Sequence, residues 1–154
     1  AQGYAHESSE FFGTPLKVVA GAAFVFNPLI EWTGGGLVDN PQDLVRWGQA
    51  LYEGKVLEVD YLSELLEPGF VADPERPAEG YGLGVRVADS DGYGLVYGHG
   101  GFFAGYNSRL MYFPDSGVAI ALQINSDKSE IGDHTMALAQ LVLDGLEEET
   151  SNAY

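Results

Sequence analysis

The chain has 154 residues, of which 45% are apolar, so we expect a single compact domain over residues 1–154 with its own hydrophobic core. Seven Lys and Arg residues against 23 Asp and Glu residues give a net charge of -16, which repels phosphate groups and excludes nucleic acid as an expected partner. With no cysteine, three scattered histidines and no apolar run near the roughly 18 residues that span a bilayer, we expect no disulfide, metal, cofactor or membrane span.

The first half of the chain contains one long apolar stretch and two helical patterns. Asp39 or Asn40 can cap the free amides at a helix start, and Pro41 suits the first helical turn. Leucines at helical spacing follow, and a Pro-containing segment ends this half. The predicted elements are a buried strand over 18–26, helices over 41–53 and 58–67, and a loop over 73–80.

The second half reads as consecutive strands and one terminal helix. Alternating apolar residues are separated by Gly-rich and Asp-rich turns, which is typical of hairpins. The predicted elements are strands over 81–89, 93–98, 106–113 and 118–124 and a helix over 129–147, with Ser129 as its cap. The sequence therefore predicts an α+β fold in which an antiparallel meander is flanked by helices.

The chemistry-bearing residues follow the strand predicted over 93–98, in the sequence His99-Gly100-Gly101-Phe102. A second group, Gly105-Tyr106-Asn107-Ser108, opens the next strand. From these letters alone, the favoured interpretation of His99 is a strand histidine whose ring a backbone carbonyl satisfies. Tyr106 by itself would indicate little.

Residues 81–127 resemble the C-terminal core of the serine β-lactamase-like hydrolases, which include class C β-lactamases, D-Ala-D-Ala carboxypeptidases and related esterases. The resemblance extends to Gly35-Gly36-Leu37-Val38, Asp43-Leu44 and Gly54-Lys55. It implies a partial β-lactamase or transpeptidase-like fold, in which this chain is the C-terminal portion of a larger hydrolase domain. A periplasmic or secreted location follows from the resemblance only.

The resemblance also assigns roles to the residues of the motif. Gly100 and Gly101 would let a substrate backbone lie against the strand edge, and the Phe102 amide would point into the oxyanion hole. His99 would stand where many relatives carry a lysine, and it offers less positive charge at neutral pH. The resemblance implies catalytic roles for His99, Gly101 and Phe102 and substrate binding by Gly100, Gly105, Tyr106 and Asn107.

Two motifs of the resembled family are missing from the chain. No serine has a lysine three positions later, and no Tyr or Ser has an Asn two positions later. We therefore expect the C-terminal fragment of a serine hydrolase that attacks amide, ester or β-lactam carbonyls through an acyl-enzyme, and that is inactive alone. The alternative is a non-catalytic binding or regulatory module derived from the same fold.

The two hypotheses imply different partners. A hydrolase would take a small-molecule or peptide-like substrate, and its site would be completed by the N-terminal half of the same hydrolase or by a second copy through dimerisation. A stand-alone binding module would be a folded monomer. The size of the protein in solution discriminates between these expectations.

Overall fold

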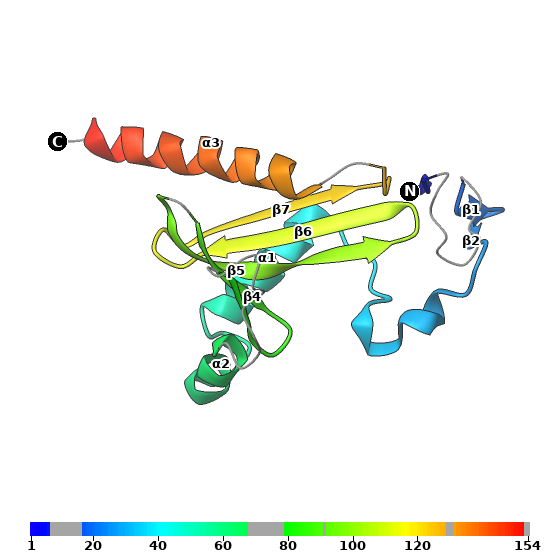
Figure 1. The fold of residues 1–154 in the computed structure, drawn as a ribbon, viewed down its shortest axis with the longest axis horizontal. Helices are drawn as coiled ribbons and strands as arrows, with labels where there is room; N and C mark the ends of the chain where they lie inside the picture. Colours follow the sequence, from blue (N-terminus) through cyan, green and yellow to red (C-terminus); the bar gives the residue numbers. More distant parts are fainter. Residues whose placement is uncertain (7–16, 68–78, 91, 129–130, 153–154) are drawn as a thin grey trace.

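In the computed structural model, which describes residues 1–6, 17–67, 79–90, 92–128 and 131–152, the chain forms a five-stranded antiparallel sheet. The strands follow one another in the order β3-β4-β5-β6-β7, so the sheet is a meander (Figure 1). Their bounds are β3 Glu79–Tyr81, β4 Arg86–Ser90, β5 Gly94–Phe103, β6 Tyr106–Phe113 and β7 Val118–Ile124.

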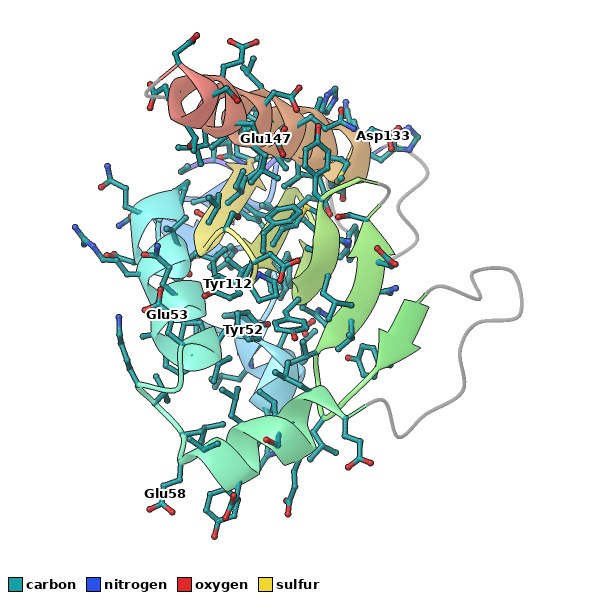
Figure 2. All side chains as sticks on the ribbon, turned by 90° about the vertical axis from the view of Figure 1, so that its left-hand side faces the viewer. Tyr52, Glu53, Glu58, Tyr112, Asp133 and Glu147 are labelled. Atoms are coloured by element: carbon teal, nitrogen blue, oxygen red, sulfur yellow. The ribbon has the colours of Figure 1, made fainter. Side chains whose placement is uncertain are left out.

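Helices cover both faces of this sheet. The long helix α3 (Ile131–Ser151) lies along one face, while α1 (Pro41–Tyr52) packs against the other, and α2 (Val59–Leu66) lies beside α1 (Figures 1 and 2). An antiparallel meander between two helical layers is the α+β fold that the sequence predicts, and this prediction is confirmed.

Helix α1 begins and ends where the residue types require. The side chain of Asn40 accepts a hydrogen bond from the backbone N–H of Asp43 at 3.1 Å, and Pro41 occupies the first turn, where no N–H is needed. Gly54 follows the helix with a φ of 72°, a left-handed conformation that glycine adopts without strain. Gly48 is buried against Leu110 of β6, so the helix packs closely on the sheet.

Alternate residues of β6 build two cores, one on each face of the sheet. Met111 and Phe113 pack under α3 together with Leu143. Leu110 and Tyr112 pack on the opposite face with Tyr52 of α1. The rings of Tyr52 and Tyr112 stack with their centroids 5.4 Å apart, between α1 and the sheet (Figure 2). The strand period of two thus fixes which side chains each helix covers.

The segment before α1 differs from the sequence prediction. Instead of one buried strand over 18–26, the structure has a two-stranded hairpin, β1 (Val19–Ala20) and β2 (Ala23–Phe24), because Gly21 and Ala22 adopt positive φ and turn the chain. A 3-10 helix, η2 (Pro28–Gly34), follows. Val18 alone within the predicted strand is fully buried.

The predicted strand over 81–89 is also interrupted. The chain leaves β3 after Tyr81 and turns over 82–85, where the N–H of Leu83 donates to the Leu65 carbonyl at 2.9 Å. Gly82 lies so close to that carbonyl that a Cβ would collide with it, so the turn packs directly against α2. The predicted cap Ser129 and most of the predicted loop over 73–80 lie outside the described residues.

Candidate active site

The strand β5 has two halves with different neighbours. From Gly94 to Gly98 it pairs with β4, whose first residue, Arg86, stands opposite Gly98. From Tyr97 to Phe103 it pairs with β6. Within the described residues, therefore, the half from His99 to Phe103 has a strand on one side only, and its other edge is open. The open edge begins at the first residue of the His-Gly-Gly motif.

The hairpin that joins β5 to β6 determines which way the backbone of this open half points. Phe103 and Tyr106 face each other across a two-residue turn, Ala104–Gly105, and the strands then pair without a bulge. Because hydrogen-bonded and non-hydrogen-bonded pairs alternate in an antiparallel ladder, the amides of Gly100 and Phe102 are directed away from β6, toward the open edge. This is the orientation that an oxyanion-binding amide requires.

The ring of His99 is held at both nitrogens. Its Nδ1 lies against the carbonyl oxygen of Gly100, and its Nε2 lies 2.7 Å from the hydroxyl oxygen of Tyr81 at the end of β3. The two rings meet nearly edge to face, with centroids 5.7 Å apart and planes at 69°. The His99 side chain is otherwise exposed.

The glycines of β5 fall into two kinds. A Cβ at Gly98 would collide with the backbone carbonyl of Leu110, so Gly98 is required by strand packing. A Cβ at Gly100 would come no closer than 3.4 Å to the Arg109 side chain, and one at Gly101 would meet only the side chain of Ser108. Gly100 and Gly101 are therefore not needed to avoid a clash with backbone atoms. Their lack of a side chain leaves the backbone of β5 accessible, which the close approach of a substrate requires.

The remaining candidate substrate-binding residues lie at the end of the hairpin. Gly105 occupies the turn with a φ of 81°, and its N–H donates to the carboxylate of Asp127 at 3.0 Å. The Tyr106 hydroxyl donates to the Ala1 carbonyl at 2.7 Å, and Asn107 donates its amide to the Ser126 carbonyl at 3.5 Å. These hydrogen bonds tie the hairpin to the N-terminal residues and to the end of β7. The structure thus gathers His99, Gly100, Gly101 and Phe102 at one edge and gives the other three structural contacts.

Tyr81 is a residue of this site that the sequence did not reveal. It lies 18 positions from His99 in the sequence, where its residue type indicates only the start of a strand. A correct register for the β3-β4-β5 meander would have brought the two close together. The predicted strand over 81–89 hid that register because it merged β3 with β4.

In the part of the chain that the structure describes, no three histidine or acidic side chains gather in a way that could hold a metal ion. No described helix combines the length and the apolar character needed to cross a membrane.

The chain thus has an α+β fold in which a meander with helices on both faces carries His-Gly-Gly at a strand edge. A model of the family described as Beta-lactamase matches residues 1–143, so the chain belongs to the β-lactamase family. The resemblance expected from the sequence is thereby confirmed.

Solved structures agree with this assignment. A D-amino acid amidase from Ochrobactrum anthropi SV3, complexed with L-phenylalanine amide, is 23% identical with a TM-score of 0.69 and covers 97% of this chain and 43% of its own. A D-stereospecific amidohydrolase from Streptomyces sp. is 34% identical with a TM-score of 0.51, covering 56% and 25%. A penicillin binding protein from Bacillus halodurans is 22% identical with a TM-score of 0.55, covering 66% and 30%.

The chain therefore spans between 25% and 43% of the length of these three proteins. No protein in the comparison with curated sequences matches.

Proposed function

We propose that this chain supplies the substrate-binding strand edge of a serine hydrolase that cleaves amide, ester or β-lactam carbonyls through an acyl-enzyme. The observation that carries the proposal is the open half of β5, where His99-Gly100-Gly101-Phe102 has a partner strand on one side only within the described residues. An extended substrate can lie along this edge as an additional strand. Its scissile carbonyl then reaches the outward amide of Phe102.

The proposed chemistry divides the work between this edge and a nucleophile supplied from outside it. A serine hydroxyl attacks the carbonyl carbon and gives its proton to a neighbouring base, while the Phe102 amide stabilises the negative charge that develops on the carbonyl oxygen. The amine or alcohol leaves with a proton, and water then hydrolyses the acyl-enzyme. Since no serine of this chain belongs to a Ser-x-x-Lys motif, we expect this chain alone to give no turnover.

Among the possible carbonyl substrates, amides are favoured. The relatives from Streptomyces and Ochrobactrum are a D-stereospecific amidohydrolase and a D-amino acid amidase, and the first is 34% identical over the matched region. In addition, His99 stands where the resembled family often carries a lysine, and both nitrogens of its ring already have partners in Tyr81 and Gly100, which weakens recognition of a substrate carboxylate. Amides of D-amino acids are therefore the first substrates to test.

The nucleophile would come from the N-terminal half of the same hydrolase. Residues before α1 offer apolar surface for such a contact, since the relative exposures of Trp32, Leu37 and Val38 are 84%, 93% and 91%. Large apolar side chains this close together in sequence and at such exposures are unusual for a surface that meets only water. A second copy of this chain is the competing occupant, and a dimer in solution would favour it.

The test uses the complete protein encoded by the gene that contains this chain. Its sequence is read for Ser-x-x-Lys, and the purified product is incubated with D-phenylalanine amide, L-phenylalanine amide, a p-nitrophenyl ester and a chromogenic cephalosporin. We expect ammonia release from the D-amide and a covalent adduct on serine by mass spectrometry. If the complete product has no such serine and forms no adduct, the hydrolase proposal fails and the binding-module alternative takes its place.

A matched pair of variants ties the activity to the strand edge. Gly101→Val places a branched side chain on β5 beside the open edge, where its Cβ would displace the Ser108 hydroxyl, while Gly145→Val places the same side chain on α3, where a Cβ meets nothing within 4 Å. We expect Gly101→Val to lose at least about tenfold in kcat/KM, equivalent to roughly 1.4 kcal/mol, and Gly145→Val to keep the wild-type value. Equal activities of the two variants would argue against substrate binding at this edge.

A further inference from the structure

The contact between Tyr81 and His99 joins two strands that are not neighbours in the sheet. β3 and β5 are separated by β4, and strands spaced by one intervening strand lie about 10 Å apart. The tyrosine is the last residue of β3, and His99 is the first residue of β5 past the end of β4. The long phenol ring therefore reaches the imidazole at the point where the open edge begins.

The two hydrogen bonds at this ring select one form of the neutral imidazole. The Gly100 carbonyl oxygen can only accept, so the proton must be on Nδ1 for that contact to be a hydrogen bond. Nε2 is then unprotonated and accepts from the Tyr81 hydroxyl at 2.7 Å. Free histidine in water favours the opposite form, with the proton on Nε2, so the site has to hold the less common one.

We propose that Tyr81 is a positioning residue that fixes His99 as its Nδ1–H tautomer and holds the ring at the open edge of β5. The Tyr81 hydroxyl supplies the hydrogen-bond donor that Nε2 needs. With the Gly100 carbonyl as the sole partner of the ring, Nε2 would accept a hydrogen bond from water instead. The role of the pair in catalysis rests on the proposed function, whereas its tautomer is a property of the folded chain itself.

The consequence for the proposed hydrolase concerns what a substrate meets at this edge. With Nε2 occupied by Tyr81, the neutral pair presents the phenol oxygen, which still has a lone pair and can accept a hydrogen bond. A substrate group that donates, such as an amine or an amide N–H, fits this arrangement, and a carboxylate does not. The Tyr81–His99 pair would thereby favour substrates that carry a hydrogen-bond donor next to the carbonyl group that is cleaved.

The test is nitrogen-15 NMR of this chain, labelled at histidine, at about pH 9, where an ordinary histidine is neutral. Three histidines give three sets of ring signals, and His99→Gln assigns the relevant one. We expect the protonated-nitrogen signal of His99 at Nδ1. Finding the proton on Nε2 in the wild type overturns the proposal without any variant.

The variant Tyr81→Phe keeps the ring and removes only the hydroxyl. Because one hydrogen bond is worth about 0.5–1.5 kcal/mol, the ratio of the Nδ1–H to the Nε2–H form should fall by about twofold to thirteenfold. The matched control is Tyr93→Phe, which removes a tyrosine hydroxyl bonded to Asp144 at 2.6 Å, and it should leave His99 unchanged. An unchanged tautomer ratio in Tyr81→Phe overturns the proposal.

If Tyr81→Phe does not fold, 3-fluorotyrosine replaces tyrosine throughout the chain and makes each hydroxyl a stronger donor. We then expect the Nε2 signal of His99 to move, with His134 as the internal reference. Equal shifts at His99 and His134, or no shift at His99, contradict the proposed contact. Since every spectrum is recorded without substrate, the tautomer can be established even if the hydrolase proposal fails. In the same way, hydrolase activity of the complete protein can be established even if the tautomer proposal fails.

Discussion

The two halves of β5 belong to one continuous strand but have opposite surroundings. In the half from Gly94 to Gly98, β4 pairs along one side, and β6 joins on the other side at Tyr97 and Gly98. Val96 is buried in the core under α3, and Tyr97 packs with the aromatic rings beneath α1. In the half from His99 to Phe103, β6 alone is paired within the described residues. Here His99, Gly101 and Phe102 are exposed. Stability and the proposed function are therefore separated at the Gly98–His99 bond.

This separation has a physical reason in the sequence. Val96 and Tyr97 carry the apolar area that this half of the strand buries, and β4 is just long enough to end opposite Gly98. The next three residues, His99, Gly100 and Gly101, contribute little apolar area, so leaving this edge open costs little free energy. A rigid half thus holds the accessible half in place, as is common where a binding site is mounted on a packed scaffold.

The largest expected change in stability comes from a substitution in the core under α3, next to the covered half of β5. Phe113 of β6 is 1% exposed under α3, so Phe113→Ala should lower the free energy of unfolding by about 3–5 kcal/mol through lost burial and the cavity it leaves. Urea denaturation followed by circular dichroism measures this change. A loss below about 1 kcal/mol would mean that the core under α3 can collapse around the smaller side chain.

The matched control is Phe102→Ala in the open half. Phe102 has 52% of its surface exposed, so we expect the same substitution to cost less than about 1 kcal/mol. A similar loss for both phenylalanines would show that the open half contributes to the core as much as the covered half, and the comparison would fail.

Alkaline pH tests the contribution of the core under α1 to stability. Burial raises the pKa of Tyr52 to about 12, while the unfolded chain ionises near the ordinary value of 10.0. Because the folded value is the higher one, the stability contribution is complete below the unfolded pKa and is lost as the pH rises toward the folded pKa. Between about pH 9 and pH 11.5 this amounts to roughly 2 kcal/mol.

The measurement compares the wild type with Tyr52→Phe by urea denaturation at both pH values. The variant should lose about 2 kcal/mol less between the two, since its ring stays packed against Tyr97 and Tyr112 but has no proton to lose. The other tyrosines are common to both proteins and cancel in the difference. Parallel curves would mean that the Tyr52 hydroxyl reaches water in the folded protein.

Much of the fold could be predicted from the sequence because local patterns decide it. The strands over 106–113 and 118–124 appear with the predicted bounds, and the helix predicted over 41–53 ends within one residue of the observed α1. In these elements the spacing of apolar residues, the capping Asn40 and the turn glycines all favour the same structure. The family resemblance then gave the correct architecture.

The errors occur where a contact distant in sequence overrides the local pattern. The strand over 81–89 looked continuous, but Leu83 donates its N–H to the carbonyl of Leu65 on α2 and Gly82 packs against that carbonyl, a contact that no local rule contains. The same distance hid Tyr81 as a partner of His99. The motif His99-Gly100-Gly101 could be found from its letters, whereas the end of β4, which makes its edge open, depends on strand register.

The smallest expected effect tests the boundary between the two halves with a single methyl group. In Gly98→Ala the new Cβ would overlap the Leu110 carbonyl, a backbone atom that cannot move without distorting the β5–β6 pair. We expect a loss of about 1–3 kcal/mol in the free energy of unfolding. In Gly100→Ala the Cβ would lie 3.4 Å from the end of the flexible Arg109 side chain, which can shift, and neither glycine has a positive φ.

For Gly100→Ala we therefore expect a change within about 0.5 kcal/mol, because the lower entropy of the unfolded chain offsets a slight crowding. Thermal or urea unfolding of the two variants side by side gives the difference. Two residues apart on one strand, the same substitution should be costly where the new Cβ meets the backbone of β6 and tolerated where it meets only a flexible side chain. If Gly100→Ala is as damaging as Gly98→Ala, the glycines of the motif serve packing rather than access, and the main support for a substrate-binding edge is lost.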